Sequence, residues 1–311
     1  MNLHQFRFVQ EAVRQNLNLT ETAKALFTSQ PGVSKAILEL EGELGVDIFA
    51  RHGKRLRRVT EPGAEVLKAI EIIMREVNNL KRIGDEFSNQ DAGTLSIATT
   101  HTQARYVLPE PVARLRKRFP KVNVSLHQGN PQQVARMVIE EVAEVGLATE
   151  SLDRYDELVT LPCYEWQHVV VVPADHKLAQ VTQLTLEDLA SEPIITYHPS
   201  FTGRTKIDAA FAAKKLSPRI ALEAIDSDVI KTYVRTGLGI GIVAEMAVNG
   251  DPTNDLVIKP VGHLFGTNVA RIAFKRSAYL RNFVYTFAEL LADRLTRKVI
   301  DKAMSGRGDD E

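Results

Sequence analysis

The sequence predicts an N-terminal winged helix-turn-helix, a long coiled-coil linker helix and a C-terminal two-lobed α/β domain. Three observations support this fold class: short, closely spaced helical patterns over 1–60, an unbroken helical stripe over 61–87, and alternating strand-like and helical runs over 93–295. A chain of 311 residues exceeds one ordinary domain core, so it has room for all three parts. We expect a C-terminal tail over 296–311, whose last residues, 305–311, look frayed.

The first domain contains two predicted short helices joined by a tight turn. Asn18-Leu19-Thr20-Glu21 has the form of a capping box, with Asn18 as the cap and Glu21 three residues later. Gly45 is well placed to end the second helix. This spacing is typical of a helix-turn-helix, in which the start and the outward face of the second helix meet base edges of DNA. The candidate contact residues there are Ser29, Gln30, Pro31, Ser34 and Lys35.

A basic segment follows the second helix. The run from Arg51 to Arg58 contains five basic residues in eight positions and no acidic residue, and Gly53 permits a tight turn. We interpret it as a β-hairpin wing whose Arg51, Lys54 and Arg55 neutralise phosphates or enter the minor groove. A basic run by itself is more often a solvated surface, but the neighbouring helix-turn-helix favours DNA binding. The whole chain has 39 basic and 39 acidic residues, which argues against nonspecific binding by its entire surface.

Residues 61–87 form one predicted helix, with no glycine or proline between Ala64 and Ile83. Apolar residues repeat along it at alternating four- and three-residue steps, as in a coiled-coil seam. A stripe of this length cannot be buried on the small first domain alone, so we expect a dimer. The seam consists of Val66, Ile70, Ile73, Val77 and Leu80.

The alternation of strand-like and helical runs after residue 93 predicts parallel sheets with crossover helices. The segment is long enough for two lobes, and we expect lobe I over about 93–162 and 268–295 and lobe II over about 165–266. The segment from Cys163 to Glu165 is the expected crossover between the lobes.

The number of cysteines and the hydropathy of the sequence indicate the cellular compartment in which we expect the protein. The single Cys163 excludes an internal disulfide and fits a reducing environment. No apolar run approaches the length of a membrane span, and the first residues lack the hydrophobic stretch of a signal peptide. We therefore expect a cytoplasmic protein with no membrane partner.

Several short segments of residues 1–60 match a known pattern: Leu26, Thr28 to Ser34, Leu40-Glu41, Leu44-Gly45, Ile48 to Arg51, and Thr60 to Gly63. On these segments the chain resembles the LysR-type transcriptional regulators. Thr22 departs from the family pattern, which usually has an alanine there, but a threonine still fits a helix–helix contact. The resemblance implies a homodimer or homotetramer that binds a dyad-symmetric promoter site on double-stranded DNA and contacts RNA polymerase. It implies no enzymatic activity, no cofactor and no metal.

Two polar segments of the α/β domain are candidate anion-binding loops. Thr100-His101-Thr102-Gln103 follows a predicted strand and opens a helix, and Phe201-Thr202-Gly203-Arg204 opens another. Helix N-termini carry unpaired amide donors and a partial positive charge, and hydroxyl or amide side chains add neutral donors. Two such termini across a cleft would grip a carboxylate or a sulfate. For either segment alone, helix capping by the threonines is the more common explanation.

The resemblance extends into the α/β domain, through Ile97 to Tyr106, Leu161 to Tyr164, Phe201 to Arg204 and Asp228 to Arg235. These segments are similar to the LysR-type regulators of cysteine biosynthesis, with a two-lobed effector domain like that of periplasmic binding proteins. This implies an activator of sulfur assimilation whose effector is N-acetylserine or O-acetylserine, with sulfate, sulfide or thiosulfate as counter-signals. A related branch that regulates the use of alternative sulfur sources shares most of the pocket, and an unrelated effector also remains open. The implied pocket residues are Thr100, Thr102, Gln103, Thr149 and Thr202, with Trp166 near the cleft.

Two other classes of protein fit less well. The run from Gly237 to Gly241 superficially resembles a dinucleotide loop, but it precedes a strand-like run and has the wrong spacing. No serine lies in a nucleophile elbow, and the eight histidines show no metal-ligand spacing, so an enzyme is disfavoured. A solute-binding protein would explain the α/β domain but not the basic wing.

Overall fold

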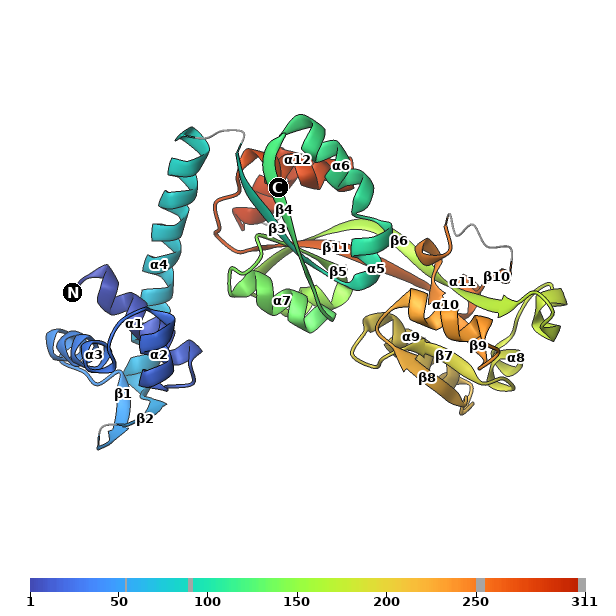
Figure 1. Ribbon diagram of the computed structural model, residues 1–311, viewed down its shortest axis with the longest axis horizontal. Coiled ribbons are helices and arrows are strands. Elements are labelled where there is room, and N and C mark those ends of the chain that lie inside the picture. The colour runs from blue at the N-terminus through green and yellow to red at the C-terminus, as the bar shows by residue number, and fades with distance from the viewer. Residues whose placement is uncertain (54, 89–91, 250–254, 307–311) are drawn as a thin grey trace. The chain divides into compact units, whose positions relative to one another are not determined.

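The computed structural model describes residues 1–53, 55–88, 92–249 and 255–306, apart from the side chains of Glu150 and Thr202. The chain divides into two compact units, Met1–Gly84 and Asp85–Glu311. Figure 1 shows a mainly helical smaller unit and a larger unit in which helices cover β-sheet.

The smaller unit is a winged helix-turn-helix whose helices begin at polar caps. Asn18 caps α2 by accepting hydrogen bonds from the amides of Thr20 and Glu21, as the sequence predicts. The reciprocal half of the expected capping box does not form, since the Glu21 carboxylate pairs with Lys24 instead. Gly45, at φ 70°, ends α3 in the left-handed conformation that favours glycine. The elements are α1 (Leu3–Arg14), α2 (Leu19–Ala25), α3 (Gln30–Leu44), β1 (Phe49–His52), β2 (Arg55–Val59) and the start of α4 (Glu61–Ser88).

The long helix α4 is anchored on the core of this unit. A Cβ atom at Gly63 would lie 2.1 Å from the carbonyl oxygen of Ile48, so only glycine allows this close approach. Further along, Ile70 is 2% exposed and belongs to the same hydrophobic cluster as Val33 and Ile37 of α3. The helix-turn-helix and the first part of α4 therefore share one core.

The predicted coiled-coil seam is divided between two environments. Val66 and Ile70 pack on the core of the smaller unit, whereas Ile73 is 39% exposed and Leu80 is 68% exposed. The seam is thus shorter than its sequence pattern suggests, because its first turns are already covered within the unit. The exposed part of the stripe is the part that a second chain could cover.

The larger unit contains a nine-stranded sheet system in the order β4-β3-β5-β11-β6-β9-β7-β8, with β10 paired to β6. Pairing is parallel where the sequence predicts it, among β3, β4 and β5 and among β7, β8 and β9. It is antiparallel wherever β6 or β11 takes part, which the sequence pattern did not indicate. The strands are β3 (Ala92–Thr99), β4 (Lys121–Gln128), β5 (Val145–Thr149), β6 (Leu158–Pro173), β7 (Ile194–Tyr197), β8 (Ile220–Ala224), β9 (Ile240–Ala244), β10 (Leu256–Pro260) and β11 (Thr267–Lys275).

Two strands connect the two lobes. Leu158 to Gln167 of β6 pair with β11, and His168 to Val171 then pair with β9 of lobe II. On its other side, β11 pairs with β5 of lobe I. Strand β6 therefore changes its partner between Gln167 and His168, two residues beyond the segment from Cys163 to Glu165 where we expect the crossover.

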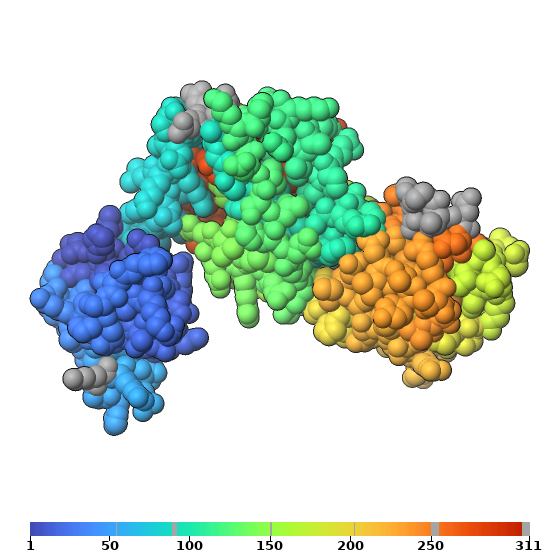
Figure 2. Space-filling model, in the orientation of Figure 1, coloured from blue at the N-terminus to red at the C-terminus, as the bar shows by residue number. Residues whose placement is uncertain are grey.

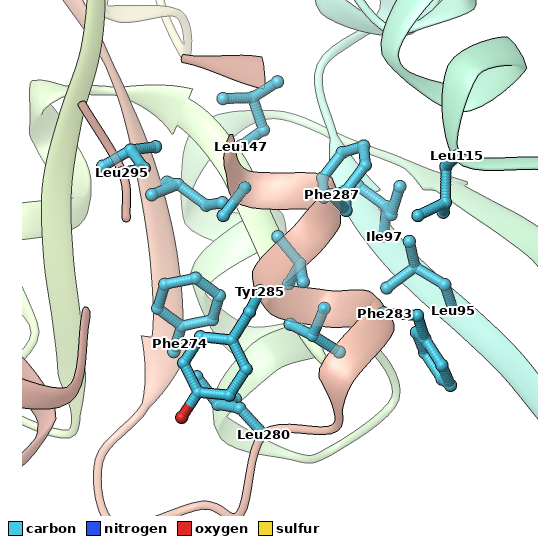
Figure 3. Packing of buried hydrophobic residues seen from close by; sticks show 14 of the residues in the cluster. Leu95, Ile97, Leu115, Leu147, Phe274, Leu280, Phe283, Tyr285, Phe287 and Leu295 are labelled. Atoms are coloured by element: carbon cyan, nitrogen blue, oxygen red, sulfur yellow. The ribbon is translucent and has the colours of Figure 1, made fainter. Parts of the chain in front are cut away.

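Helices cover both lobes, and α12 fills the centre of lobe I. Phe283 and Phe287 of α12 are at most 2% exposed and pack against Leu95 and Ile97 of β3 (Figure 3). The α-helices of the larger unit after α4 are α5 (His101–Tyr106), α6 (Pro109–Arg118), α7 (Pro131–Ile139), α8 (Leu186–Ala190), α9 (Thr202–Ala213), α10 (Ser227–Arg235), α11 (Gly262–Phe265), α12 (Asn282–Leu291) and α13 (Arg297–Met304).

The expected tail over 296–311 is wrong for its first part. The hydroxyl of Thr296 caps α13, and Ile300 is fully buried in the hydrophobic cluster of lobe I. The Tyr285 hydroxyl donates to Asp301 at 2.5 Å and fastens α13 to α12. Met304 of the same short helix also packs against this cluster, and so small an apolar stripe is easily missed in the sequence. Residues 307–311 lie outside the described residues.

A search of the described helices for a long apolar segment that could cross a membrane finds none.

We expect Ile73→Glu to dissociate the assembly and to reduce DNA binding with it. The side chain is exposed within the unit, so folding tolerates the change, whereas burial of an unpaired carboxylate at a chain–chain seam costs several kcal/mol. Light scattering would measure the mass of the assembly. Lys68→Glu changes charge on another face of the same helix and should leave the mass unchanged. An intact oligomer of the Ile73→Glu protein would place the interface elsewhere.

Candidate functional site

The outward face of α3 presents polar side chains beside its buried face. Val33 and Ile37 are fully buried, which leaves Lys35 exposed and Ser34 half-buried. Ser29 is the N-cap, and its hydroxyl accepts from the amide of Gly32 at 3.3 Å, so part of its function is to start the helix. Gln30 and Pro31 occupy the first turn. This face has the shape and polarity that a recognition helix requires.

The basic segment forms the predicted β-hairpin. Strands β1 and β2 are antiparallel, and Gly53 turns between them at φ 60°. Arg55, Arg57 and Arg58 are exposed on β2. The hairpin protrudes from the smaller unit in Figures 1 and 2. Lys54, at its tip, lies outside the described residues.

Arg51 has a different role from the expected phosphate contact. Its guanidinium lies 2.7 Å from the carboxylate of Glu41, which is 4% exposed. The same carboxylate accepts from the backbone amides of Ile48 and Phe49 at 2.9 and 3.0 Å. Arg51 therefore neutralises a buried acid and ties the base of the wing to α3. The free cations of the described part of the wing are on β2.

A cavity of about 40 Å³ lies between the two lobes of the larger unit. At about 10–15 Å³ per water, this is room for roughly three water molecules or one small anion. Its lining comes from the polar start of α5, the end of β5, the middle of β6 and the start of α9. The lining residues are Thr100, Thr102, Gln103, Pro131, Thr149, Trp166, Tyr197, Phe201, Gly203, Ala244 and Met246.

Thr100 and Gln103 present polar atoms to this cavity. Thr100 occupies the N-cap position of α5, but its side chain makes no capping hydrogen bond. Gln103 is 3% exposed, and its carbonyl oxygen Oε1 accepts from the hydroxyl of Tyr164. The Thr100 side chain therefore does not cap α5, which was the alternative explanation for this threonine.

The other expected pocket residues lie around the same cavity. Thr149 is 7% exposed and its hydroxyl lies 3.4 Å from that of Ser151. Trp166 is 6% exposed, lines the cavity, and has an indole N–H with no hydrogen-bond partner among the described residues. The backbone of Thr202 begins α9, and its side chain lies outside the described part of the structure.

The floor of the cavity allows no side chain at Gly203. A Cβ atom there would lie 2.9 Å from Nε2 of His168 and 3.3 Å from the Trp166 ring. His168 is fully buried, and burial lowers its pKa to about 3, so the imidazole is neutral at physiological pH. None of the described residues that line the cavity carries a charged side chain, and the polar groups that they offer are neutral.

Sequence reasoning did not single out three residues that line the cavity or hydrogen-bond to its lining: Tyr164, Tyr197 and Ser227. The hydroxyl of Ser227 lies 3.3 Å from that of Thr102 and 2.7 Å from that of Tyr197. The Tyr197 hydroxyl in turn accepts from the amide of Ala244 at 2.9 Å. Ser227 lies 125 positions from Thr102, and Tyr164 lies 61 positions from Gln103, so no local motif identifies them.

A charged network beside the cavity joins the lobes, and its centre is Asp228 on α10. The carboxylate of Asp228 accepts from the Tyr106 hydroxyl at 2.5 Å and lies 2.5 Å from Arg105 and 3.2 Å from Lys231. Burial alone would raise the pKa of Asp228, but the hydrogen bonds from Tyr106 and Lys231 outweigh it and lower the pKa. We call this network, with the pair His101–Asp226 at 3.1 Å, the interlobe latch.

Among the described residues, the latch contains a group of His and Asp side chains that lie close enough together to hold a metal ion. The ligand atoms of His101, Asp226 and Asp228 lie within 4.8 Å of one another. Arg105 and Lys231 already occupy the Asp228 carboxylate, and a metal cation would compete with both. The donor set therefore fits an ion-pair network better than a metal site.

We expect Asp228→Asn to loosen the contact between the lobes, because Lys231 would lose its carboxylate partner. Since solvent partly screens these ion pairs, we expect the free energy of unfolding to fall by roughly 1–2 kcal/mol. Since the pKa of Asp228 is lowered, its contribution is present above its ordinary value of 3.8 and is lost as the pH falls further. Hydrogen exchange should quicken in both α5 and α10. Asp208→Asn, which breaks a pair inside lobe II, is the matched control. Unchanged exchange in α5 would contradict the latch.

Comparisons with known proteins agree with this architecture. Residues 3–64 match the bacterial regulatory helix-turn-helix family of lysR type, and residues 88–296 match the LysR substrate binding domain. The chain is 59% identical over 309 residues to the transcriptional regulator CysB of Burkholderia cenocepacia, covering 99% of both chains. It is 46% identical over 311 residues to the regulator cbl of Escherichia coli, covering 100% of this chain and 98% of that protein.

The larger unit also has a solved structural relative. The cofactor-binding domain of the Cbl transcriptional regulator matches with a TM-score of 0.66 and 45% identity, over 68% of this chain and 93% of that chain. These relatives are named regulators, and the matched domains bind DNA and effectors rather than catalyse a reaction. The chain belongs to the LysR family of bacterial transcriptional regulators.

Proposed function

We propose that the chain is mainly an activator of genes for sulfur assimilation and cysteine biosynthesis that responds to a small anionic effector. The observation that carries the proposal is the neutral cavity between the lobes, lined by the buried Thr100 and Gln103 and by Trp166, whose indole N–H has no hydrogen-bond partner among the described residues. Unpaired buried polar groups are costly, so a cavity that gathers several of them is suited to a polar ligand. The 59% identity to CysB supports the assignment to sulfur metabolism.

The effector class follows from the charge of the cavity. Hydroxyl, amide and indole donors, together with the start of α9, stabilise an anion without a neutralising cation. N-acetylserine and O-acetylserine are the proposed effectors, and sulfate, sulfide or thiosulfate are the proposed counter-signals. The proposed contact set is Thr100, Thr102, Gln103, Thr149 and Thr202, with Trp166 beside it.

A second candidate is a Cbl-like regulator of alternative sulfur sources. The 45% identity to the cofactor-binding domain of Cbl favours it. Thermal-shift titration of the full chain distinguishes the two, since a CysB-like protein should be stabilised by the acetylserines and a Cbl-like protein by another sulfur metabolite. Stabilisation by neither would indicate an unrelated effector.

The regulator would act in the cytoplasm as a dimer or a dimer of dimers. Two chains would place their α3 helices and wings on a dyad-symmetric promoter site and would contact RNA polymerase from there. An effector bound between the lobes would favour one arrangement of the latch, and through it one arrangement of the DNA-binding units.

Replacement of Lys35 by alanine should weaken binding to a specific operator by about 1–3 kcal/mol, if its side chain meets a base edge. Arg55→Ala should instead weaken binding to all duplexes and reduce the slope of affinity against salt by about one. Fluorescence anisotropy with operator and scrambled DNA at several salt concentrations measures both effects. Lys68→Ala removes a cation from α4 and serves as the control. Wild-type operator binding by the Lys35→Ala protein would show that the recognition face is misassigned.

Thr100→Val keeps the side-chain volume and removes the hydroxyl donor. We expect it to lower effector affinity by about one to two decades, because a hydrogen bond to a charged group contributes roughly 1.5–3 kcal/mol. Calorimetric titration with N-acetylserine and sulfate measures the affinity, and a melting curve measures stability.

The neighbouring Thr99→Val is a matched control for this experiment. The Thr99 hydroxyl donates to the carbonyl of Leu147 at 3.0 Å inside the core. Its loss should therefore lower the melting temperature and preserve effector affinity. If Thr100→Val behaved in the same way, the cavity would not be the effector site.

A further inference from the structure

Helix α12 begins without a cap from its own segment. The residue at its N-cap position is Arg281, whose side chain makes no capping hydrogen bond, and its first turn contains no acidic residue. A helix N-terminus presents unpaired N–H groups and a partial positive charge, which a carboxylate stabilises. The start of α12 therefore depends on an acceptor from another part of the fold.

Glu86, near the end of α4, supplies this acceptor. Both oxygens of its carboxylate lie 3.3 Å from the backbone nitrogen of Asn282, whose N–H donates to them, although the two residues are 196 positions apart. Burial raises the pKa of Tyr279, and the charge of Glu86 and a hydrogen bond to its carboxylate raise it further, so the tyrosine hydroxyl stays protonated beside Glu86. We call the contact between Glu86 and the N–H of Asn282 the interhelix cap. Both of its residues belong to the larger unit.

Arg281 holds the start of α12 on lobe I. Its guanidinium lies 2.8 Å from the carboxylate of Glu144 and donates to the carbonyl oxygen of Thr94 at 2.7 Å. Beside it, Phe283 is 2% exposed and packs in the hydrophobic core of lobe I (Figure 3). Glu86 therefore contacts a part of lobe I that an ion pair and the core already hold in place.

The strands next to Arg281 extend to the proposed effector cavity. Thr94 lies near the start of β3, and Glu144 directly precedes β5. At their other ends, β3 leads into Thr100 and β5 ends at Thr149, and both threonines line the cavity. The two strands are paired in parallel. A displacement of the cavity lining can therefore reach the start of α12 through two hydrogen-bonded strands.

We propose that Glu86 is a positioning residue that holds the end of α4 on lobe I through the interhelix cap and so passes a change at the cavity to α4. Helix α4 is continuous from Glu61 to Ser88, so a change at its last turn acts on a single element. Loss of the cap would release this last turn from lobe I and leave the cavity lining intact. The cap itself does not depend on any effector, whereas the transmission rests on the proposed function of the cavity as an effector site.

The first test measures hydrogen exchange in the full-length protein without any effector. Glu86→Ala removes the carboxylate and keeps a strong helix former in α4. We expect exchange to quicken by about three- to tenfold in the peptide that begins α12 and in the peptide that ends α4, as for loss of a helix cap. Glu65→Ala is the matched control, because it removes a carboxylate of the same helix that pairs only with the exposed Lys68 among the printed ion pairs of the described residues. Unchanged exchange at α12 in the Glu86→Ala protein would overturn the interhelix cap.

The second test removes the donor instead of the acceptor. Asn282→Pro deletes the N–H that Glu86 accepts, at the first helical position, where proline is well tolerated. Arg281 has an extended backbone, at φ −78° and ψ 157°, which suits a residue before proline. We expect Asn282→Pro and Glu86→Ala to quicken exchange at the end of α4 by similar factors, and the double variant to exceed neither. Multiplied effects in the double variant would show that Glu86 does not act through α12.

The third test measures the transmission as the ratio of DNA affinities with and without N-acetylserine. Fluorescence anisotropy would use operator DNA that the wild-type protein selects from random-sequence duplexes. We expect a ratio of about five or more for the wild-type and Glu65→Ala proteins and a ratio near one for Glu86→Ala, which should still bind N-acetylserine in calorimetry. A wild-type ratio in the Glu86→Ala protein would overturn the transmission. A wild-type protein that does not respond would instead overturn the proposed effector, and hydrogen exchange would still decide whether the interhelix cap exists.

Discussion

The antiparallel pairing of β6 with β11 is the constraint on which the larger unit depends. Strand β6 is 16 residues long and passes from lobe I, where it pairs with β11, into lobe II, where it pairs with β9 and β10. Alternate residues of a strand share a face. Tyr164, Trp166 and His168 therefore lie in sequence along the floor between the lobes, where they meet Gln103, the cavity and Gly203. One ladder thus fixes the relation of the lobes and the floor of the site.

The short helix α5 carries the neutral side chains that line the cavity and the charged side chains of the latch on different positions. Thr100 and Gln103, at the start of α5, face the cavity, whereas His101 and Arg105 face the latch acids of α10. The proposed anion in the cavity and the ion pairs of the latch would therefore act on the same element. If the lobes have two arrangements, ligand binding and latch formation are coupled through α5 without any longer pathway.

In the smaller unit, the buried carboxylate of Glu41 joins α3 to the wing. Glu41 of α3 accepts from two amides at the start of the wing and from Arg51. A buried carboxylate needs several such partners to offset its desolvation. The recognition helix and the hairpin are consequently held as one body, and the shared core with α4 extends that body to the first turns of the long helix. Any movement passed along α4 would reach helix and wing together.

The sequence alone determined those structural features that depend only on residues close together in the chain. The cap at Asn18, the turn at Gly53, the buried face of α3 and the division into strands and helices all follow from local spacing and side-chain chemistry. The tertiary structure decided what depends on distant segments: the antiparallel connection between lobes, the docking of α13 by Ile300, the engagement of Arg51 by Glu41, and the Tyr164–Gln103 contact. Thr100 and Gln103, which the resemblance proposes as site residues, line the cavity, but their hydrogen bonds were not predicted from the sequence. Whether a threonine caps its helix or lines a cavity depends on the partners that the folded sheet brings near it. The spacing of residues along the chain does not predict these partners.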